Sequence, residues 1–143
     1  MSTRKQHREK QQSKQAAKPV EVQGWVKPFI ATPAYDGKFD NDYVVSMAET
    51  CMVAPQFKIL PQLTTMRNGA FIDVARNRFV EMFLKSDCTH LFFIDADLKW
   101  EPRAFIGLVR SGLPVCAGIY RKRQEPEEYP VRCIPNPDEP GTI

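Results

Sequence analysis

The chain has 143 residues and a formal net charge of +3 at pH 7, and this length predicts one domain with a core of its own. It contains no apolar stretch long enough to span a membrane, and its first residues lack the apolar core of a signal peptide. Setting aside residues 1–18, which hold six of the 20 basic residues and one of the 17 acidic ones, leaves 14 basic against 16 acidic residues. A nucleic-acid-binding function would therefore rest on the first segment alone, and we expect no specific nucleic-acid partner.

Composition divides the chain into three parts. Residues 1–19 are rich in Lys, Arg and Gln and are expected to form a disordered basic tail. Residues 20–123 carry the periodic apolar segments of a folded domain, and residues 124–143 form a Pro-rich extended loop or arm. The four cysteines are Cys51, Cys88, Cys116 and Cys133. They show no spacing typical of a zinc site, and three of them lie in or beside apolar segments. Reduced, buried thiols are therefore expected, in a cytoplasmic protein (in the host cytoplasm if the chain is viral).

The first half of the domain reads as strand, helix, strand. Residues 27–32 (KPFIAT) predict a strand that ends at the turn residues Pro33 to Gly37. Residues 42–54 predict a helix, with Asn41 or Asp42 at its start and Pro55 after its end. Its buried face is predicted from the apolar residues at helical spacing, which are Val44, Val45, Ala48, Cys51 and Met52. Residues 57–65 predict a second strand, and Pro61 within it places that strand at or near a sheet edge.

The second half continues the alternation. After the turn signal Asn68-Gly69, residues 70–85 predict a helix whose apolar stripe is Ile72, Ala75, Phe79, Met82 and Phe83. The run HLFFI from His90 predicts a strand buried on both faces, and Pro102 opens a further helix that ends at Gly112. Residues 114–119 (PVCAGI) predict a fourth buried strand. This order predicts an α/β fold, with a Rossmann-like, mostly parallel sheet, right-handed crossovers and helices on both faces.

Two carboxylates, Asp95 and Asp97, follow the apolar run HLFFI directly. In open α/β sheets ligands bind beyond the carboxyl ends of the strands, and residues i and i+2 of an extended chain point to the same side. Two hard oxygen ligands suit Mg²⁺ or Mn²⁺. The alternative is that Asp95 caps the following turn and Asp97 is simply solvated.

Other polar residues follow strands that would end at the same edge. Tyr35 could stack on a base or pack on the domain. Arg76 could contact a phosphate or pair locally with Asp73 or Asn77. Arg121 to Arg123 form a basic turn after the predicted fourth strand, which suits a polyanionic substrate or is simply solvated. The glycine fingerprints of dinucleotide-binding enzymes and P-loop NTPases are missing from the sequence, so a metal would have to hold a diphosphate.

Four segments together resemble a known family: IATPAYDGKFD, NGAFIDVARNRFVEMFL, HLFFIDADLKWEPRAFIGLV and PVCAGIYRKR. In this combination they are similar to glycosyltransferases of the GT-A fold, of the family 2-like type found in phages and environmental genomes. The resemblance covers Lys27 to Arg123, and its specific part is the Asp-x-Asp strand with its flanking helices. It implies a UDP- or GDP-sugar donor, an Mn²⁺ or Mg²⁺ cofactor and an acceptor that it does not identify.

The resemblance also implies roles by position, for residues of the first loop, the second helix and the Asp-x-Asp strand. Thr32, Pro33 and Tyr35 would hold the nucleoside base, and Arg76 would contact the nucleotide. Asp95 would touch the ribose or the metal, and Asp97 would be the main metal ligand. The metal would neutralise the charge that grows on the departing nucleoside diphosphate. Arg121 or Arg123 would assist at the phosphates.

One departure from the family limits the prediction. Such enzymes usually continue well past this length, and their later part carries the acceptor site and the catalytic base of inverting members. The acidic residues after Arg123 are candidates for this base only by residue type, and they are Glu127, Glu128, Asp138 and Glu139. No catalytic residue is therefore assigned, and we expect a donor-binding part that is incomplete at the C-terminus.

Two other functions stay open. One is a sugar-nucleotide-binding or interaction domain without catalysis. The other is a phosphatase of the haloacid dehalogenase type, although Lys99 stands where that family has Thr or Val.

Overall fold

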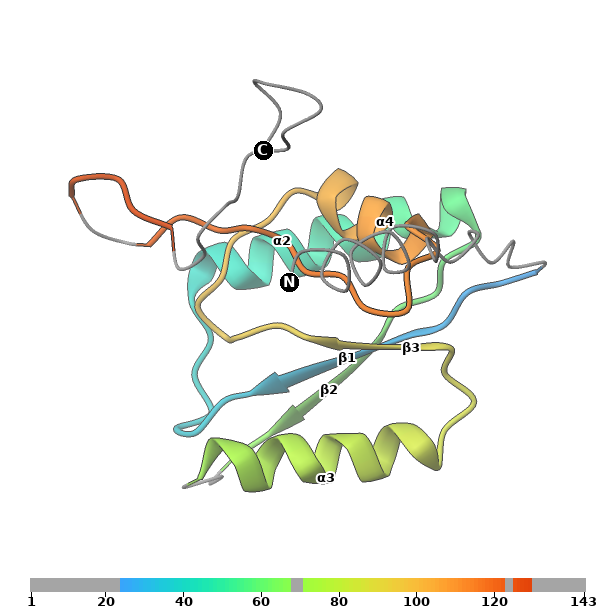
Figure 1. The fold of residues 1–143 in the computed structure, drawn as a ribbon, viewed down its shortest axis with the longest axis horizontal. Coiled ribbons are helices and arrows are strands. Elements are labelled where there is room, and N and C mark those ends of the chain that lie inside the picture. The colour runs from blue at the N-terminus through green and yellow to red at the C-terminus, as the bar shows by residue number, and fades with distance from the viewer. Residues whose placement is uncertain (1–23, 68–70, 123–124, 130–143) are drawn as a thin grey trace, which may run out of the picture.

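The computed structural model describes residues 24–67, 71–122 and 125–129 (Figure 1). The predicted tail at 1–19, the turn Asn68-Gly69 and most of the arm at 124–143 lie outside the described residues. The strands are β1 (Pro28–Pro33), β2 (Gln62–Met66) and β3 (His90–Phe93). The helices are α2 (Asn41–Val53), the short 3₁₀ helix η1 (Ala54–Phe57), α3 (Ile72–Leu84) and α4 (Pro102–Arg110).

The three strands form one all-parallel sheet in the order β2-β1-β3. The central strand β1 is buried along most of its length, and its Ile30 pairs with Leu63 of β2 and Phe92 of β3. The fold is therefore α/β and Rossmann-like in topology, as the sequence predicted. The prediction that Pro61 marks an edge strand is also confirmed, because β2 begins directly after it and lies at one side of the sheet.

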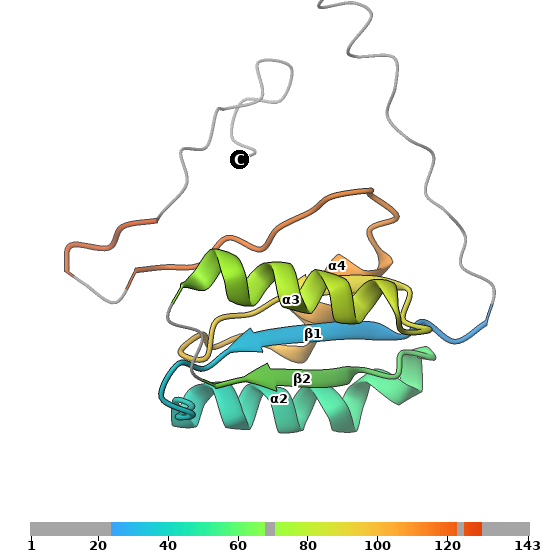
Figure 2. The ribbon, with the colours of Figure 1, turned by 90° about the horizontal axis from the view of Figure 1, so that it is seen from below.

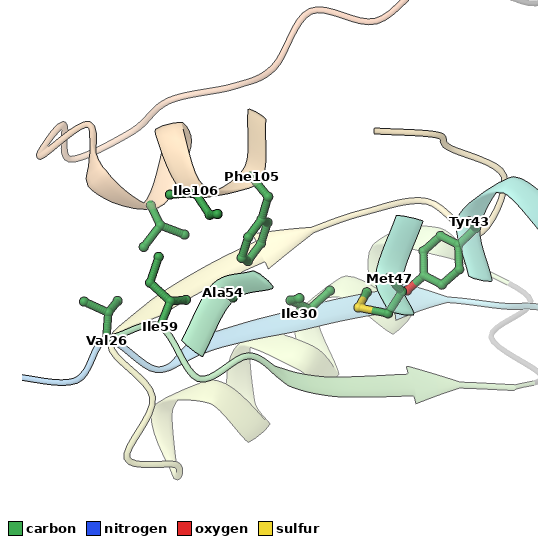
Figure 3. Packing of buried hydrophobic residues seen from close by; sticks show 9 residues of the cluster. Val26, Ile30, Tyr43, Met47, Ala54, Ile59, Phe105 and Ile106 are labelled. Carbon is green, nitrogen blue, oxygen red and sulfur yellow. The ribbon is translucent and has the colours of Figure 1, made fainter. Parts of the chain in front are cut away.

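Helices cover both faces of this sheet. Successive residues of a strand point to opposite faces, so Phe29 and Ala31 pack against Phe79 of α3, while Ile30 points the other way. On that second face α2 and α4 lie together over the sheet (Figures 1 and 2). Figure 3 shows the larger cluster between these two helices and the strands: Val26, Ile30, Tyr43, Met47, Ala54, Ile59, Phe105 and Ile106 are labelled.

The buried face of α2 differs from the predicted one. The side chains that pack inward are Tyr43, Ser46, Met47 and Thr50. The residues of the predicted stripe, Val44, Val45, Ala48, Cys51 and Met52, are exposed, and Met52 is 77% exposed. The prediction was wrong because apolarity alone does not identify the buried face: Ser46 and Thr50 enter the interior with hydrogen-bonding partners, as described below. The helix start is also one residue earlier, since Asp40 is the N-cap and its carboxylate accepts from the Asp42 N–H at 3.0 Å.

Residues 114–119 do not form the predicted fourth strand. They belong to no strand and are exposed, with Val115 at 88%. The path from β1 to β2 uses α2 on one face, and the path back across the sheet to β3 uses α3 on the other, so both crossovers have the same hand. A further parallel strand beside β3 would have to be reached through α4, on the face that α2 covers. That crossover would have the opposite hand to the first two, and about 98% of crossover connections in parallel sheets share one hand.

Smaller corrections concern the third strand, the second strand and the thiols. β3 was predicted to be buried on both faces, but it is only half-buried and its Phe93 is 40% exposed, because it lies at one side of the sheet instead of at its centre. The predicted strand 57–65 begins only at Gln62, because the chain first forms η1 and then a left-handed residue, Lys58, with φ of 56°. Cys51 and Cys116 are exposed, and Cys88 is half-buried, so the predicted burial of the thiols was wrong for two of these three. Within the described ranges, no helix has both the length and the apolar character to cross a membrane.

Candidate functional site

A hollow of about 350 Å³ opens at the carboxyl edge of the sheet. Three segments line it. The first is the end of β1 and the loop after it, with Pro33, Ala34, Tyr35, Asp36 and Lys38. The second is the start of α3, with Ile72 and Arg76, and the third is the turn after β3, with Asp95, Ala96 and Asp97.

The connections between strands explain why the hollow forms here. The chain leaves β1 and β3 toward the face covered by α2 and α4, but it leaves β2 toward the face covered by α3. The hollow therefore lies at the carboxyl edge, between the two sets of connections. Crevices at this edge are where open α/β sheets bind ligands.

The alternation of β3 brings Asp95 to the α3 side of the sheet. Phe92 and Ile94 pack into the cluster under α2 and α4, whereas Leu91 packs into the cluster under α3. Arg76 of α3 places its guanidinium 5.6 Å from the centre of the Phe93 ring, within cation–π range. Its Nη2 also lies 3.5 Å from Asp95 Oδ1. Arg76 therefore forms its ion pair with Asp95 of the Asp-x-Asp motif rather than with Asp73 or Asn77, and the expected phosphate contact stays a prediction.

The turn that carries Asp97 is tied to α2. Leu98 N–H donates to the Asp95 carbonyl at 3.2 Å, and Asp40 N–H donates to the Ala96 carbonyl at 2.9 Å. Together these bonds fix the backbone on either side of Asp97.

Trp100 extends this attachment. Its backbone N–H donates to Ser46 Oγ at 3.1 Å, and its indole Nε1–H donates to Thr50 Oγ1 at 2.9 Å. The Trp100 ring packs edge-on against Tyr43, with 5.3 Å between ring centres. Sequence reasoning missed these residues as supports of the site; the available signal was two small hydroxyl residues, Ser46 and Thr50, at i, i+4 spacing in an apolar helix.

The loop after β1 is held at its base and at its tip. Ala34 N–H donates to the Met66 carbonyl at 3.0 Å, and Gly37 N–H donates back to the Ala34 carbonyl at 2.9 Å, which closes a tight turn. Gly37 has φ of 74°, and the guanidinium of Arg67 lies so close to it that a Cβ would stand 2.5 Å from Arg67 Nε. Tyr35, at the tip, is 67% exposed beside the hollow.

A charged pair stands next to Tyr35 on this loop. Lys38 Nζ lies 3.2 Å from Asp36 Oδ2, and the Lys38 backbone N–H donates to Asp36 Oδ1 at 3.0 Å. The hydrogen bonds from Lys38, first from its backbone and then from its side chain, lower the pKa of the Asp36 carboxyl. Asp36 therefore remains ionised at neutral pH and is a weaker base than an ordinary aspartate.

The structure brings together five of the predicted site residues and separates others. Pro33, Tyr35, Arg76, Asp95 and Asp97 all line the hollow. The remaining predicted residues are Thr32, Arg121 and Arg123. Thr32 is fully buried, with its Oγ1 2.6 Å from the Tyr43 hydroxyl, and is not among the lining residues. Arg121 forms an ion pair with Glu125 and is not among the lining residues, and Arg123 lies outside the described residues.

Asp95 and Asp97 suit Mg²⁺ or Mn²⁺ better than Zn²⁺. Within the described part of the chain, His, Cys, Asp and Glu side chains form no group of three or more that could hold a metal ion. Structural and catalytic zinc sites need three or four such ligands. Mg²⁺ and Mn²⁺ are held by one or two carboxylates, with waters and substrate phosphates as the other ligands, and Asp95 and Asp97 would be the two carboxylates here.

No protein-family model, curated protein or solved structure matches the chain.

Proposed function

We propose that the hollow binds a nucleoside-diphosphate sugar together with Mn²⁺ or Mg²⁺, and that the protein is a glycosyltransferase of the GT-A, family 2-like type. The observation that carries the proposal is the position of Asp95 and Asp97 at the carboxyl end of a parallel strand, in one hollow with Arg76 and Tyr35. The resemblance of the four sequence segments supports it, because these residues belong to the segments that resemble the family.

The predicted site residues would take the following roles in this function. Asp95 and Asp97 would hold the cation, which when bound supplies positive charge to the departing diphosphate. Arg76 has the planar guanidinium that binds phosphate oxygens in pairs. Tyr35 is exposed at the rim, where its ring is free to stack on a nucleoside base. Thr32 would act only by holding the base of the first loop through its hydrogen bond to Tyr43.

Calorimetric titration of UDP and GDP, with and without Mn²⁺, tests the proposal on the wild type and on Asp97→Ala. We expect one nucleotide to bind only with Mn²⁺, and Asp97→Ala to lose this binding. The control is Asp87→Ala, which also removes one carboxylate but lies before β3, at the opposite edge, in an exposed ion pair with Lys27. Absence of nucleotide binding to the wild type under both metal conditions would reject the donor-site assignment.

One observation favours a second function, binding without transfer. Inverting transferases of this kind need a carboxylate that accepts the proton of the acceptor. Asp36, with a lowered pKa, pairs with Lys38, and Asp95 faces Arg76, so both carboxylates are already engaged as charged partners.

Product release distinguishes the two functions. The protein is incubated with the UDP- or GDP-sugar whose nucleotide it binds, with Mn²⁺ present, and free nucleotide diphosphate is measured over time. Turnover above the Asp97→Ala background supports the transferase. Tight binding of the intact nucleotide-sugar without release of the diphosphate supports the binding domain.

A further inference from the structure

The hollow contains two cationic side chains, and each is already paired with a carboxylate. Lys38 Nζ lies 3.2 Å from Asp36, and Arg76 Nη2 lies 3.5 Å from Asp95. The described lining residues comprise these two cations and three carboxylates, so their formal charge is −1. A diphosphate that enters alone meets a negative surface whose cations are engaged, which disfavours binding.

Arg76 and a metal ion would compete for the carboxylate of Asp95. Its guanidinium lies over the Phe93 ring and points at Asp95, one of the two predicted metal ligands. Arg76 and Asp95 are each nearly half exposed, at 46% and 47% of the side chain, so the pair is weak and exchanges easily. A divalent ion carries twice the charge of the guanidinium and can contact Asp95 and Asp97 together, so it would displace Arg76 from Asp95.

The released guanidinium remains anchored at the hollow. The Arg76 backbone is fixed in α3, and the Phe93 ring supports the side chain from below. Once Asp95 no longer engages it, the guanidinium presents its donors to the space where a phosphate would lie.

We propose that Arg76 is a counter-ion switch: it neutralises Asp95 in the empty site, and metal binding transfers it from Asp95 to the phosphates of the nucleotide. The inference rests on the proposed nucleotide–metal site and adds a mechanism that couples the two ligands. Because coupling between two ligands is reciprocal, the metal strengthens nucleotide binding by the same factor as the nucleotide strengthens metal binding. Arg76 opposes the metal when the metal binds alone and favours the complex when both ligands are present.

Arg76→Gln tests the switch, because the two effects have opposite signs. Mn²⁺ alone is titrated and followed by the electron paramagnetic resonance signal of the free ion, and UDP and GDP are titrated by calorimetry at saturating Mn²⁺. We expect Arg76→Gln to bind Mn²⁺ alone about two- to five-fold more tightly, as expected for loss of an exposed competing pair. Its Mn²⁺-dependent nucleotide affinity should fall about tenfold or more, as expected for loss of a hydrogen bond from a charged donor.

Arg78→Gln is the matched control, since it removes the same charge from the same helix at an exposed position outside the hollow. This control measures the general effect of removing one positive charge. We expect Arg78→Gln to change the affinity for Mn²⁺ and for the nucleotide by less than about twofold. Weaker or unchanged Mn²⁺ binding by Arg76→Gln, relative to Arg78→Gln, would overturn the switch.

Asp95→Asn tests the same switch from the other partner. It removes the carboxylate that engages Arg76, so UDP or GDP without metal should bind more tightly to Asp95→Asn than to the wild type. Equal or weaker metal-free binding would contradict the switch even if the wild type binds nucleotide with Mn²⁺, whereas a wild type that binds neither Mn²⁺ nor nucleotide rejects the proposed function and the switch together.

Discussion

The attachment of Trp100 to α2 gives a measurable stability prediction. Thr50 is fully buried, and its Oγ1 accepts the Trp100 indole N–H at 2.9 Å. Thr50→Val keeps the shape of the side chain and leaves no cavity, but the indole N–H, which can only donate, loses its acceptor. Leaving a buried donor unsatisfied costs about 1–3 kcal/mol, and because Trp100 is only half-buried we expect about 1–2 kcal/mol.

Urea denaturation followed by circular dichroism measures this loss, with thermal unfolding as a second assay. For a chain of this length a loss of about 1–2 kcal/mol lowers Tm by about 3–7 °C. Thr65→Val is the matched control: it makes the same change at an exposed position of β2, where Val is favoured, and should change the stability by less than about 0.5 kcal/mol.

A double-mutant cycle with Trp100→Phe assigns the loss to the hydrogen bond. Either single substitution leaves one buried polar group without its partner, whereas the double variant removes both groups. The double variant should therefore be less destabilised than the sum of the two singles, by about 0.5–1.5 kcal/mol. Strict additivity, or equal effects of Thr50→Val and Thr65→Val, would refute the reasoning.

Three further predictions concern the core, the pH dependence and the first loop. Burial raises the pKa of Tyr43, so its neutral form stabilises the fold fully below pH 10.0, and this stabilisation is lost as pH rises through the higher folded-state pKa; Tyr43→Phe should flatten the alkaline limb of a stability–pH profile. Gly37→Ala should destabilise the protein by about 1–2 kcal/mol in urea titrations, since φ is positive and Arg67 must move, and an effect below 0.5 kcal/mol would contradict the described loop. Met47→Lys should prevent folding or lower the stability by at least about 3 kcal/mol, because Met47 is buried, while Met52→Lys should change it by less than about 0.5 kcal/mol. A larger loss for Met52→Lys than for Met47→Lys would instead support the buried face of α2 that the sequence predicted.

Local patterns predicted the elements that hold the site. The apolar run before Asp95 gave β3, Pro61 marked the edge strand, and Gly112, with φ of 66°, ends α4 as expected. These signals are short-range: a continuous apolar run, a missing backbone N–H and a left-handed glycine act within a few residues. For the same reason the Asp-x-Asp pair could be placed at the carboxyl edge before any tertiary contact was known.

The face of α2 could not be predicted in this way. Its apolar stripe and its buried stripe lie on different sides of the helix, and Ser46 and Thr50 enter the interior because Trp100 supplies donors from about 50 positions later in the chain. Burial of a polar side chain depends on whether a partner meets it, and that partner is fixed by the fold rather than by the helix.

The sequence by itself determined the three strands and the helices that form, the parallel order of the sheet, and the two carboxylates that follow the third strand, because propensity, chain-breaking residues and apolar runs act locally. Only the tertiary structure decided three other points. Arg76 forms an ion pair with Asp95, and Thr32 is buried with its hydroxyl against that of Tyr43. Residues 114–119 lie outside the sheet. Each depends on which elements lie side by side and on which face α4 packs, and such long-range placement is set by the joint packing of all the helices on the sheet.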